Sequence, residues 1–216
     1  MRLGIIAGGF KPFTSGHFSK VKLSLQRDDQ TMIIYSTLSR GEGAGKLDDQ
    51  QLTRMWDLMT PRLGLMGVQA VRARTTPFRE TYSIIGALRC ILGSFCTPDD
   101  KNTISHFNLQ QTLSGIVLYG SSKDIVNNFS RYVGTDREEK YFGNLVAEGR
   151  LKFCTDSGAD AYVEDGIDKD TAQSLSEVRG THVRELLAKR DPRAKGFLPN
   201  FLTEKDRNEM MEILGG

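Results

Sequence analysis

The sequence predicts a single α/β domain built on a parallel β-sheet. Short apolar runs of strand length recur along the chain, and segments with a helical apolar pattern separate them. The first unit is compact, with a buried strand at 3–7, a helix at 17–26 and a second buried strand at 31–36. A strand, a helix and a strand within roughly 35 residues form a right-handed crossover that joins parallel strands.

Three later runs complete the predicted sheet, at 67–73, 115–120 and 151–155. The second of them is fully apolar up to its closing glycine, as expected for a strand buried on both faces. Further helices are predicted over 48–59, 81–95, 125–132, 182–189 and 204–214. We therefore predict a Rossmann-like five-stranded parallel sheet with helices on both faces.

The helix predicted over 48–59 has the clearest pattern. Leu52, Met55, Trp56 and Met59 fall at the i, i+3, i+4, i+7 positions of one buried face, and Pro61 is expected to end the helix. Polar, irregular segments near 96–112 and 134–170 are predicted to be insertions in one domain that spans 1–216, and 156–171 is expected to be a loop.

Composition excludes several classes of protein. A net charge of +2 in 216 residues gives no electrostatic basis for binding nucleic acid. No apolar run has membrane length, and the N-terminus lacks a charged-then-apolar leader, so we expect a cytoplasmic protein with no membrane partner. The three cysteines show no C-x-x-C spacing, and reduced thiols are the simplest interpretation.

The loop after the first strand has the features of an anion-binding site. Gly8 and Gly9 end the strand, and Gly16 lets the chain approach a ligand closely before a helix begins. Backbone N–H groups and the helix dipole then point toward the same place. Thr14, Lys11 and His17 add a hydroxyl, an ammonium and an imidazole to this small region.

These residues carry a resemblance to a known family. The pattern Gly9-Phe10-x-Pro12-x-Thr14-x-Gly16-His17 resembles the first signature of the nucleotidyltransferase superfamily, which has T-x-G-H or H-x-G-H after its first strand. A second segment, 179–187, is similar to the family's I-S-S-T-x-x-R signature at the start of a late helix. Here Arg179 and Gly180 stand where the family has paired serines.

The resemblance implies transfer of a nucleoside monophosphate from ATP or CTP to a phosphorylated small molecule, with release of pyrophosphate. Mg²⁺ is then expected with the nucleotide, held mainly by phosphate oxygens and water, and no protein metal site is predicted. The residues implied as catalytic are His17, Lys11, Thr14 and Arg184, and those implied in nucleotide binding are Gly8, Gly9, Phe10, Gly16, Gly120, Gly180 and Thr181. Thr181 is expected to cap the second helix, and a homo-oligomer is possible.

Cations elsewhere in the chain are candidates for binding the acceptor. Arg40 and Lys46 belong to a glycine-rich loop that resembles a P-loop but lacks its first glycine and its Ser or Thr. Arg72 and Arg74 follow the third strand, at the edge where parallel sheets bind ligands. For all four residues, a solvated surface cation is an equally good interpretation.

The acceptor and the nucleotide stay open between several alternatives. The T-x-G-H tetrad is similar to pantetheine-phosphate adenylyltransferases, whereas the Gly-x-Phe-x-Pro-Phe run and the later Thr-x-Val-Arg are closer to nicotinamide-mononucleotide adenylyltransferases. ATP and nicotinamide mononucleotide are therefore preferred over CTP and a phospho-alcohol. A class I aminoacyl-tRNA synthetase fragment lacks support in the sequence. A non-catalytic nucleotide-binding protein is a further alternative. The feature in its favour is that Arg179 and Gly180 replace the paired serines.

Overall fold

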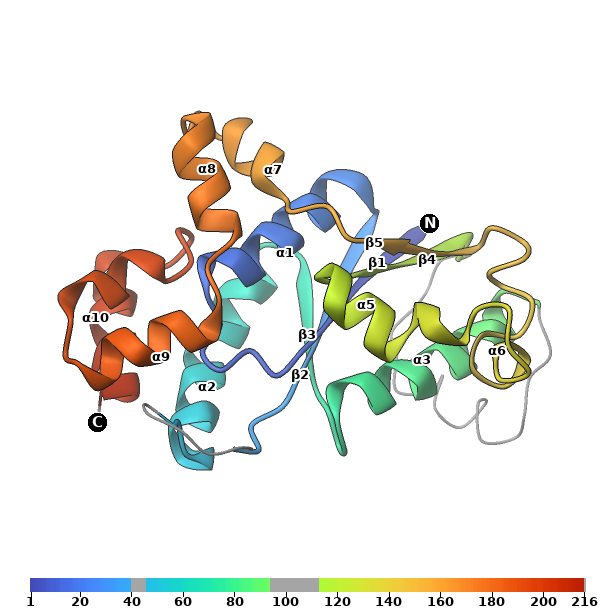
Figure 1. The fold of residues 1–216 in the computed structure, drawn as a ribbon, viewed down its shortest axis with the longest axis horizontal. Helices are drawn as coiled ribbons and strands as arrows, with labels where there is room; N and C mark the ends of the chain where they lie inside the picture. The colour runs from blue at the N-terminus through green and yellow to red at the C-terminus, as the bar shows by residue number, and fades with distance from the viewer. Residues whose placement is uncertain (40–45, 94–112, 216) are drawn as a thin grey trace.

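The computed structural model describes residues 1–39, 46–93 and 113–215, and a five-stranded sheet forms its centre (Figure 1). All four strand pairs are parallel, and the strands lie in the order β3–β2–β1–β4–β5. The strands are β1 (Arg2–Ala7), β2 (Gln30–Tyr35), β3 (Val68–Arg72), β4 (Gly115–Tyr119) and β5 (Leu151–Cys154). The predicted α/β fold, with five parallel strands, is confirmed.

Neighbouring residues of the central strands belong to two different cores. In β1, Ile6 joins one buried cluster and Ile5 joins the other, and Ile33 and Met32 of β2 divide in the same way. Successive side chains of a strand point to opposite faces, so the sheet buries both of its surfaces. This explains why the strands read as continuous apolar runs rather than as an alternating pattern.

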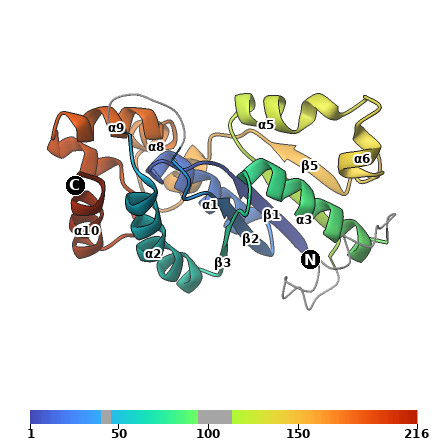
Figure 2. The same cartoon turned by 90° about the horizontal axis from the view of Figure 1, so that it is seen from below.

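Helices cover both faces of the sheet (Figures 1 and 2). One face is covered by α1 (Ser15–Arg27) and α2 (Asp49–Leu65), and α7 (Ala159–Val163), α8 (Lys169–Ser176), α9 (Gly180–Ala188) and α10 (Glu204–Gly215) share the core on this side. The other face is covered by α3 (Pro77–Ile91), α5 (Ser122–Asn128) and α6 (Glu138–Phe142). Two short 3₁₀ helices, η1 (Ser130–Tyr132) and η2 (Pro192–Phe197), complete the described elements.

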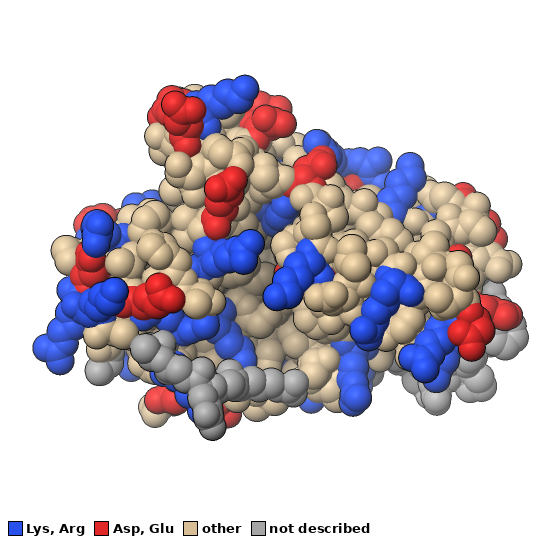
Figure 3. All heavy atoms as spheres, viewed as in Figure 1, with Lys and Arg blue, Asp and Glu red and all other residues tan. Residues whose placement is uncertain are grey.

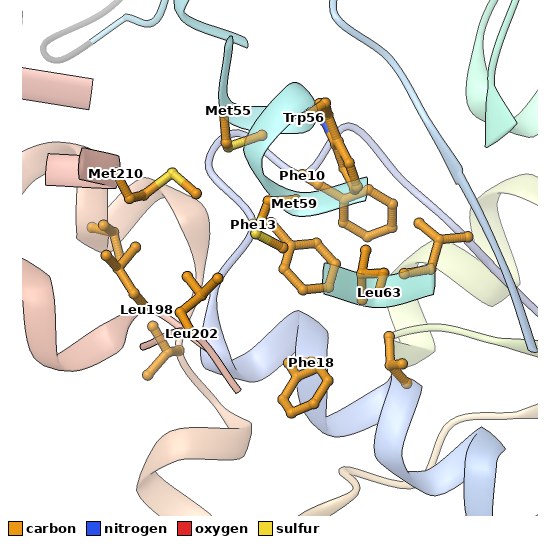
Figure 4. Close-up of a cluster of buried hydrophobic side chains, with 14 of the residues drawn as sticks. Phe10, Phe13, Phe18, Met55, Trp56, Met59, Leu63, Leu198, Leu202 and Met210 are labelled. Atoms are coloured by element: carbon orange, nitrogen blue, oxygen red, sulfur yellow. The ribbon is translucent and has the colours of Figure 1, made fainter. Parts of the chain in front are cut away.

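The C-terminal segment packs against the start of the chain (Figure 4). Met210 of α10 lies in the same buried cluster as Met59 of α2 and Phe13 of the β1–α1 loop. An ion pair adds to this contact, because Arg62 of α2 donates to Asp206 of α10 over 2.9 Å. The α1–α2 face of the sheet and the end of the chain therefore share one core.

Several predicted helix boundaries were wrong. The helix expected over 125–132 is α5, which begins and ends earlier in the chain, and the 3₁₀ helix η1 follows it. The helix expected to stop before Pro61 continues through it as α2 and ends at Leu65. The apolar face explains this, because Leu63 extends the buried stripe by one turn, and its burial offsets the hydrogen bond that proline cannot make. The helix expected from residue 81 begins at Pro77, where Thr76 accepts a capping hydrogen bond from the Arg79 N–H.

The expectation of loop over 156–171 was also wrong. This segment contains α7 and the start of α8. Tyr162 of α7 is fully buried and donates its hydroxyl hydrogen to the Ser15 carbonyl over 2.8 Å. The many acids and glycines of the segment led to the prediction of a loop, but burial of one aromatic side chain, Tyr162, holds a short helix in place. The predicted insertion at 96–112 lies outside the described residues.

Two expectations from composition can be compared with the structure. Cys90 is disulfide-bonded, so the expectation of three reduced thiols was wrong, although Cys154 is free. Among the helices of the described ranges, none is long and apolar enough to cross a membrane.

Candidate functional site

A large cavity opens at the point where the order of the sheet reverses. From β1 the chain runs outward to β2 and β3 on one side, and it returns to β4 and β5 on the other. A cavity of about 980 Å³ lies beyond the carboxyl ends of β1 and β4, between the first turn of α1, the β4–α5 turn and the α8–α9 junction. Ligands of open α/β sheets bind at this kind of crevice. Figure 3 shows a central hollow on this face of the molecule, with Lys and Arg side chains on both sides.

The structure brings six of the fourteen predicted site residues that it describes to this cavity. Those that line it are Gly8, Gly9, Phe10, Gly16, His17 and Gly120. The predicted residues that are described but do not line it are Lys11, Thr14, Lys46, Arg72, Arg74, Gly180, Thr181 and Arg184. Arg40 lies outside the described residues.

His17 presents a neutral imidazole to the cavity. The backbone N–H of Thr14 donates to Nδ1 over 3.0 Å, and a backbone N–H can only donate. Nδ1 is therefore the acceptor, and the ring hydrogen is on Nε2, for which no described residue provides a partner. Burial lowers the pKa of His17 to about 4, so the ring is uncharged at neutral pH. A neutral imidazole can donate one hydrogen bond to an anion from Nε2, and it does not have to accept a proton to do so.

Phe10 holds the His17 ring in place. Its own ring meets His17 edge-to-face, with centroids 5.1 Å apart, and meets Trp56 in the same way at 5.9 Å. The backbone of Phe10 has a φ of 46°, which is rare for a residue with a bulky side chain. The strained turn places the ring between the cavity and the core, where it contacts both.

Thr14 is used differently from the sequence-based expectation. Its side chain is fully buried and its hydroxyl donates to the Val178 carbonyl over 2.9 Å. Thr14 also begins α1 as its N-cap, and the His17 ring takes the part of the usual Glu or Gln in a capping box. We therefore assign Thr14 as a positioning residue for His17 instead of a direct phosphate contact.

The two distant motifs interlock through glycines. A Cβ on Gly16 would overlap the Val178 carbonyl oxygen, and a Cβ on Gly180 would lie 2.8 Å from the Lys11 carbonyl oxygen. The first helix therefore packs its own backbone against the segment before α9, and α9 packs against the β1–α1 loop. Both glycines allow a close approach of protein backbone to protein backbone, where we had expected an approach to the ligand.

Arg184 reinforces the same contact. Its guanidinium donates to the Lys11 carbonyl oxygen, and it also lies 3.3 Å from the Thr181 hydroxyl. The ammonium of Lys11 donates to the Leu38 carbonyl oxygen. The two cations expected at the phosphates thus join the β1–α1 loop to α9 and to the segment after β2.

Three other cations line the cavity and were not predicted as site residues. Lys20 lies one turn after His17 on α1, Lys123 lies in the first turn of α5, and Arg179 immediately precedes α9. Helical spacing from His17 could have indicated Lys20, because residues three apart share one face. Charges of both signs line the cavity, because the carboxylates of Asp124 and Glu177 lie among these cations.

The side chains of these lining residues differ in what they contact. Lys20 donates to the Asp156 carbonyl oxygen, and burial lowers its pKa. Asp124 accepts from the Ser121 hydroxyl over 2.7 Å, and Glu177 accepts from the Gln173 amide. Within the described part of the chain, the side chains of Lys123 and Arg179 have no hydrogen bond or ion pair.

The three predicted acceptor-binding cations that the structure describes do not reach the cavity. Arg74 pairs with Glu80 at the start of α3, with 3.0 Å between Nη2 and Oε1. Arg72 ends β3, the edge strand two places from β1, and Lys46 is exposed just before α2. All three lie outside the set of residues that line the cavity.

A smaller cavity of about 520 Å³ lies on the other side of the α8–α9 junction. It shares Glu177, Val178 and Arg179 with the large cavity and adds Thr181 from α9. Thr181 does not cap the helix, because α9 begins one residue earlier, at Gly180, with Arg179 as its N-cap. The helix starts there because Gly180 has to pack closely on the Lys11 carbonyl.

Comparisons with known proteins give a likeness of fold only. No protein-family model matches the chain, and no curated protein matches its sequence. One similar solved structure is that of Thermotoga maritima TmcAL bound with alpha-thio ATP, with 15% identity over 98% of this chain and 55% of that chain, and a TM-score of 0.41. This chain spans about half the length of that one. A likeness this distant carries no argument about function.

Proposed function

We propose that this protein is a nucleotidyltransferase that moves an AMP moiety from ATP to a phosphorylated small molecule. Nicotinamide mononucleotide is the preferred acceptor, and transfer of CMP from CTP to a phospho-alcohol is the alternative. The observation that carries the proposal is the position of His17. Its neutral Nε2–H group lines a cavity at the switch point of the sheet, and the second motif holds it there.

The cavity suits a nucleotide in size and in chemistry. About 980 Å³ is at the upper end of the range for small-molecule sites. Three cations line it against two carboxylates, and glycines at the ends of β1 and β4 leave room beside the backbone. A triphosphate with a base and a ribose would fill such a crevice.

The reaction needs no general base. An oxygen of the acceptor phosphate, already deprotonated, attacks the α-phosphorus of the nucleotide and forms a new P–O bond. The bond from that phosphorus to the bridging oxygen breaks, and pyrophosphate leaves with its electron pair. His17 would donate a hydrogen bond to an α-phosphate oxygen, and nearby cations would balance the charge of the leaving group.

Mg²⁺ would enter with the nucleotide. Among the described residues, no group of three or more His, Cys, Asp or Glu side chains could hold a metal ion. We propose that phosphate oxygens and water would hold most of the metal's coordination sites, as is usual for Mg²⁺–nucleotide complexes. Its chemistry would be to neutralise phosphate charge.

The experiment is an assay of pyrophosphate release with Mg²⁺ and either ATP or CTP. The acceptors are nicotinamide mononucleotide, phosphopantetheine, choline phosphate and glycerol 3-phosphate, with a control that lacks acceptor. We expect release that requires one acceptor together with ATP. Release with CTP and a phospho-alcohol would select the alternative, and equal release without any acceptor would reject group transfer.

A non-catalytic nucleotide-binding protein is the second candidate. It is favoured because Arg184 and Thr14 are committed to contacts within the protein, and Arg179 and Gly180 replace the paired serines of the resembling family. Binding of ATP without pyrophosphate release across the whole panel would support this candidate over the enzyme.

A further inference from the structure

We propose that Arg179 is the side chain of the second motif that binds the phosphates of the nucleotide, in the place that the sequence suggests for Arg184. This inference rests on the proposed nucleotide site and identifies one of its phosphate ligands. The resembling signature has a serine at this position, so the pattern alone would not select Arg179.

The first step of the argument is that Arg184 is already committed. Its guanidinium donates to the Lys11 carbonyl oxygen and lies against the Thr181 hydroxyl at 3.3 Å. It does not line the large cavity. To reach a phosphate there, Arg184 would have to abandon a charge-assisted hydrogen bond that holds the β1–α1 loop.

The second step is that Arg179 is positioned and uncommitted. It precedes α9 with an extended backbone, φ −100° and ψ 146°, and its side chain makes no capping hydrogen bond. It is exposed and lines both cavities at their shared wall. In the described ranges no side chain or carbonyl accepts from its guanidinium, so all five N–H donors are available to a ligand.

The third step concerns the charges around it. Lys123 lies on the β4–α5 side of the same cavity and is also uncommitted, whereas Lys20 and His17 lie on α1. Glu177 and Asp124 are the carboxylates of the cavity, and each accepts from a neighbouring side chain. A polyphosphate between Arg179 and the α1 side would meet a donor from each wall. A guanidinium suits phosphate because its planar donors can bind two oxygens at once.

The test compares ligand binding by Arg179→Ala, Arg179→Lys and the control Lys189→Ala. Lys189 lies at the other end of α9, is exposed and does not line either cavity. The ligands are ATP, inorganic tripolyphosphate and adenosine, with dissociation constants measured by calorimetry. Arg179→Ala should weaken ATP and tripolyphosphate by a similar factor of about 10 to 100, and it should leave adenosine unchanged. Arg179→Lys should recover part of the loss, and Lys189→Ala should bind like the wild type.

Two results would overturn the inference. One is an Arg179→Ala variant that binds ATP as tightly as the wild type does. The other is a loss confined to adenosine, which would place Arg179 at the base. The outcome is separable from that of the proposed function, because loss of phosphate binding in Arg179→Ala would support the inference even in a protein that released no pyrophosphate.

Discussion

At the scale of single residues, the protonation state of His17 depends on what surrounds it. The Thr14 N–H donates to one ring nitrogen, and Phe10 covers one edge of the ring. Burial disfavours the charged ring and lowers its pKa, and the Thr14 contact acts in the same direction because a backbone N–H cannot donate to a nitrogen that already carries hydrogen. The lowered pKa therefore makes His17 a hydrogen-bond donor through Nε2 over the whole physiological range.

This state has a consequence for stability in acid. The pKa of His17 is about 4 in the folded protein and 6.5 in the unfolded chain, so the unfolded chain binds the extra proton first. Stability is therefore lost as pH falls from about 6.5 to 4, by about 3 kcal/mol for this group. His17→Gln keeps a side-chain acceptor for the Thr14 N–H but cannot titrate, so it should lose less stability over that interval.

Urea unfolding of both proteins at pH 7 and pH 4.5 measures the difference. An NMR titration of the His17 ring provides an independent check on the pKa. A titration midpoint near 6.5 in the folded protein would contradict the neutral, buried ring.

Two glycines allow a matched test of backbone packing. Gly16→Ala should destabilise the protein by several kcal/mol, on the order of a strongly overpacked core position, because the new methyl group would overlap the Val178 carbonyl oxygen. Gly64→Ala in α2 meets nothing within 4 Å and should stabilise the protein by about 0.5–1 kcal/mol.

Thermal unfolding of both variants measures these changes. The comparison is informative because the same change, glycine to alanine, should lower the stability at position 16 and raise it at position 64. Equal effects in the two variants would mean that α1 and the segment before α9 are not in direct contact.

At the scale of elements, α9 holds the β1–α1 loop in position. Gly180 brings its first turn against the Lys11 carbonyl, and Arg184 donates to the same oxygen from the next turn. The loop in turn contributes Gly9 and Phe10 to the cavity. A helix near the end of the chain thus determines the shape of a loop near its start.

Arg184→Ala should therefore lower stability and ligand affinity together. Removing a charge-assisted hydrogen bond from a partly buried carbonyl costs about 1.5–3 kcal/mol. Nucleotide affinity should fall because the loop loosens, although Arg184 itself does not line the cavity. Calorimetric unfolding and ATP titration measure both effects, with Lys189→Ala as the control on the same helix.

Arg184 and Arg179 should be distinguishable by this pair of measurements. Arg179→Ala is expected to weaken ATP binding with little change in unfolding temperature, because the side chain is exposed and has no hydrogen bond or ion pair with another described residue. A loss of affinity in Arg184→Ala without any loss of stability would instead indicate direct contact with the ligand.

At the scale of the whole molecule, the core joins both ends of the chain. Met210 of α10 is fully buried in the same cluster as Met59 and Phe13 (Figure 4), and Asp206 pairs with Arg62. Other members of the cluster line the cavity, but Met210, Met59 and Phe13 do not. Stability and ligand binding should therefore be separable.

Met210→Ala tests this separation. Truncation of a buried methionine should lower the free energy of unfolding by about 2–5 kcal/mol. Nucleotide at 100 times its dissociation constant should still add about 2.7 kcal/mol, as it does for the wild type. Unfolding with and without ATP measures the increment, and a smaller increment in the variant would show that the core and the cavity are coupled.

Much of the fold could be read from the sequence. The five strands and their parallel arrangement follow from apolar runs too continuous for a half-exposed sheet, and from spacings that leave room for crossover helices. Gly8, Gly9, Phe10, Gly16, His17 and Gly120, all selected from the sequence, line one cavity, and their role in binding a nucleotide stays a prediction. These residues lie close to strand ends, whose position the order of the sheet determines.

Only the tertiary structure decided how the remaining residues are used. Whether Thr14 and Arg184 meet a ligand or a carbonyl depends on Val178 and Lys11, which are distant in sequence. The same holds for Pro61, whose helix continues because Leu63 finds a core to enter. Local pattern specifies strands and motifs, because these depend on neighbours along the chain. The partners of each side chain depend on packing between elements, and this is why Arg179 lines the cavity whereas Arg184 does not.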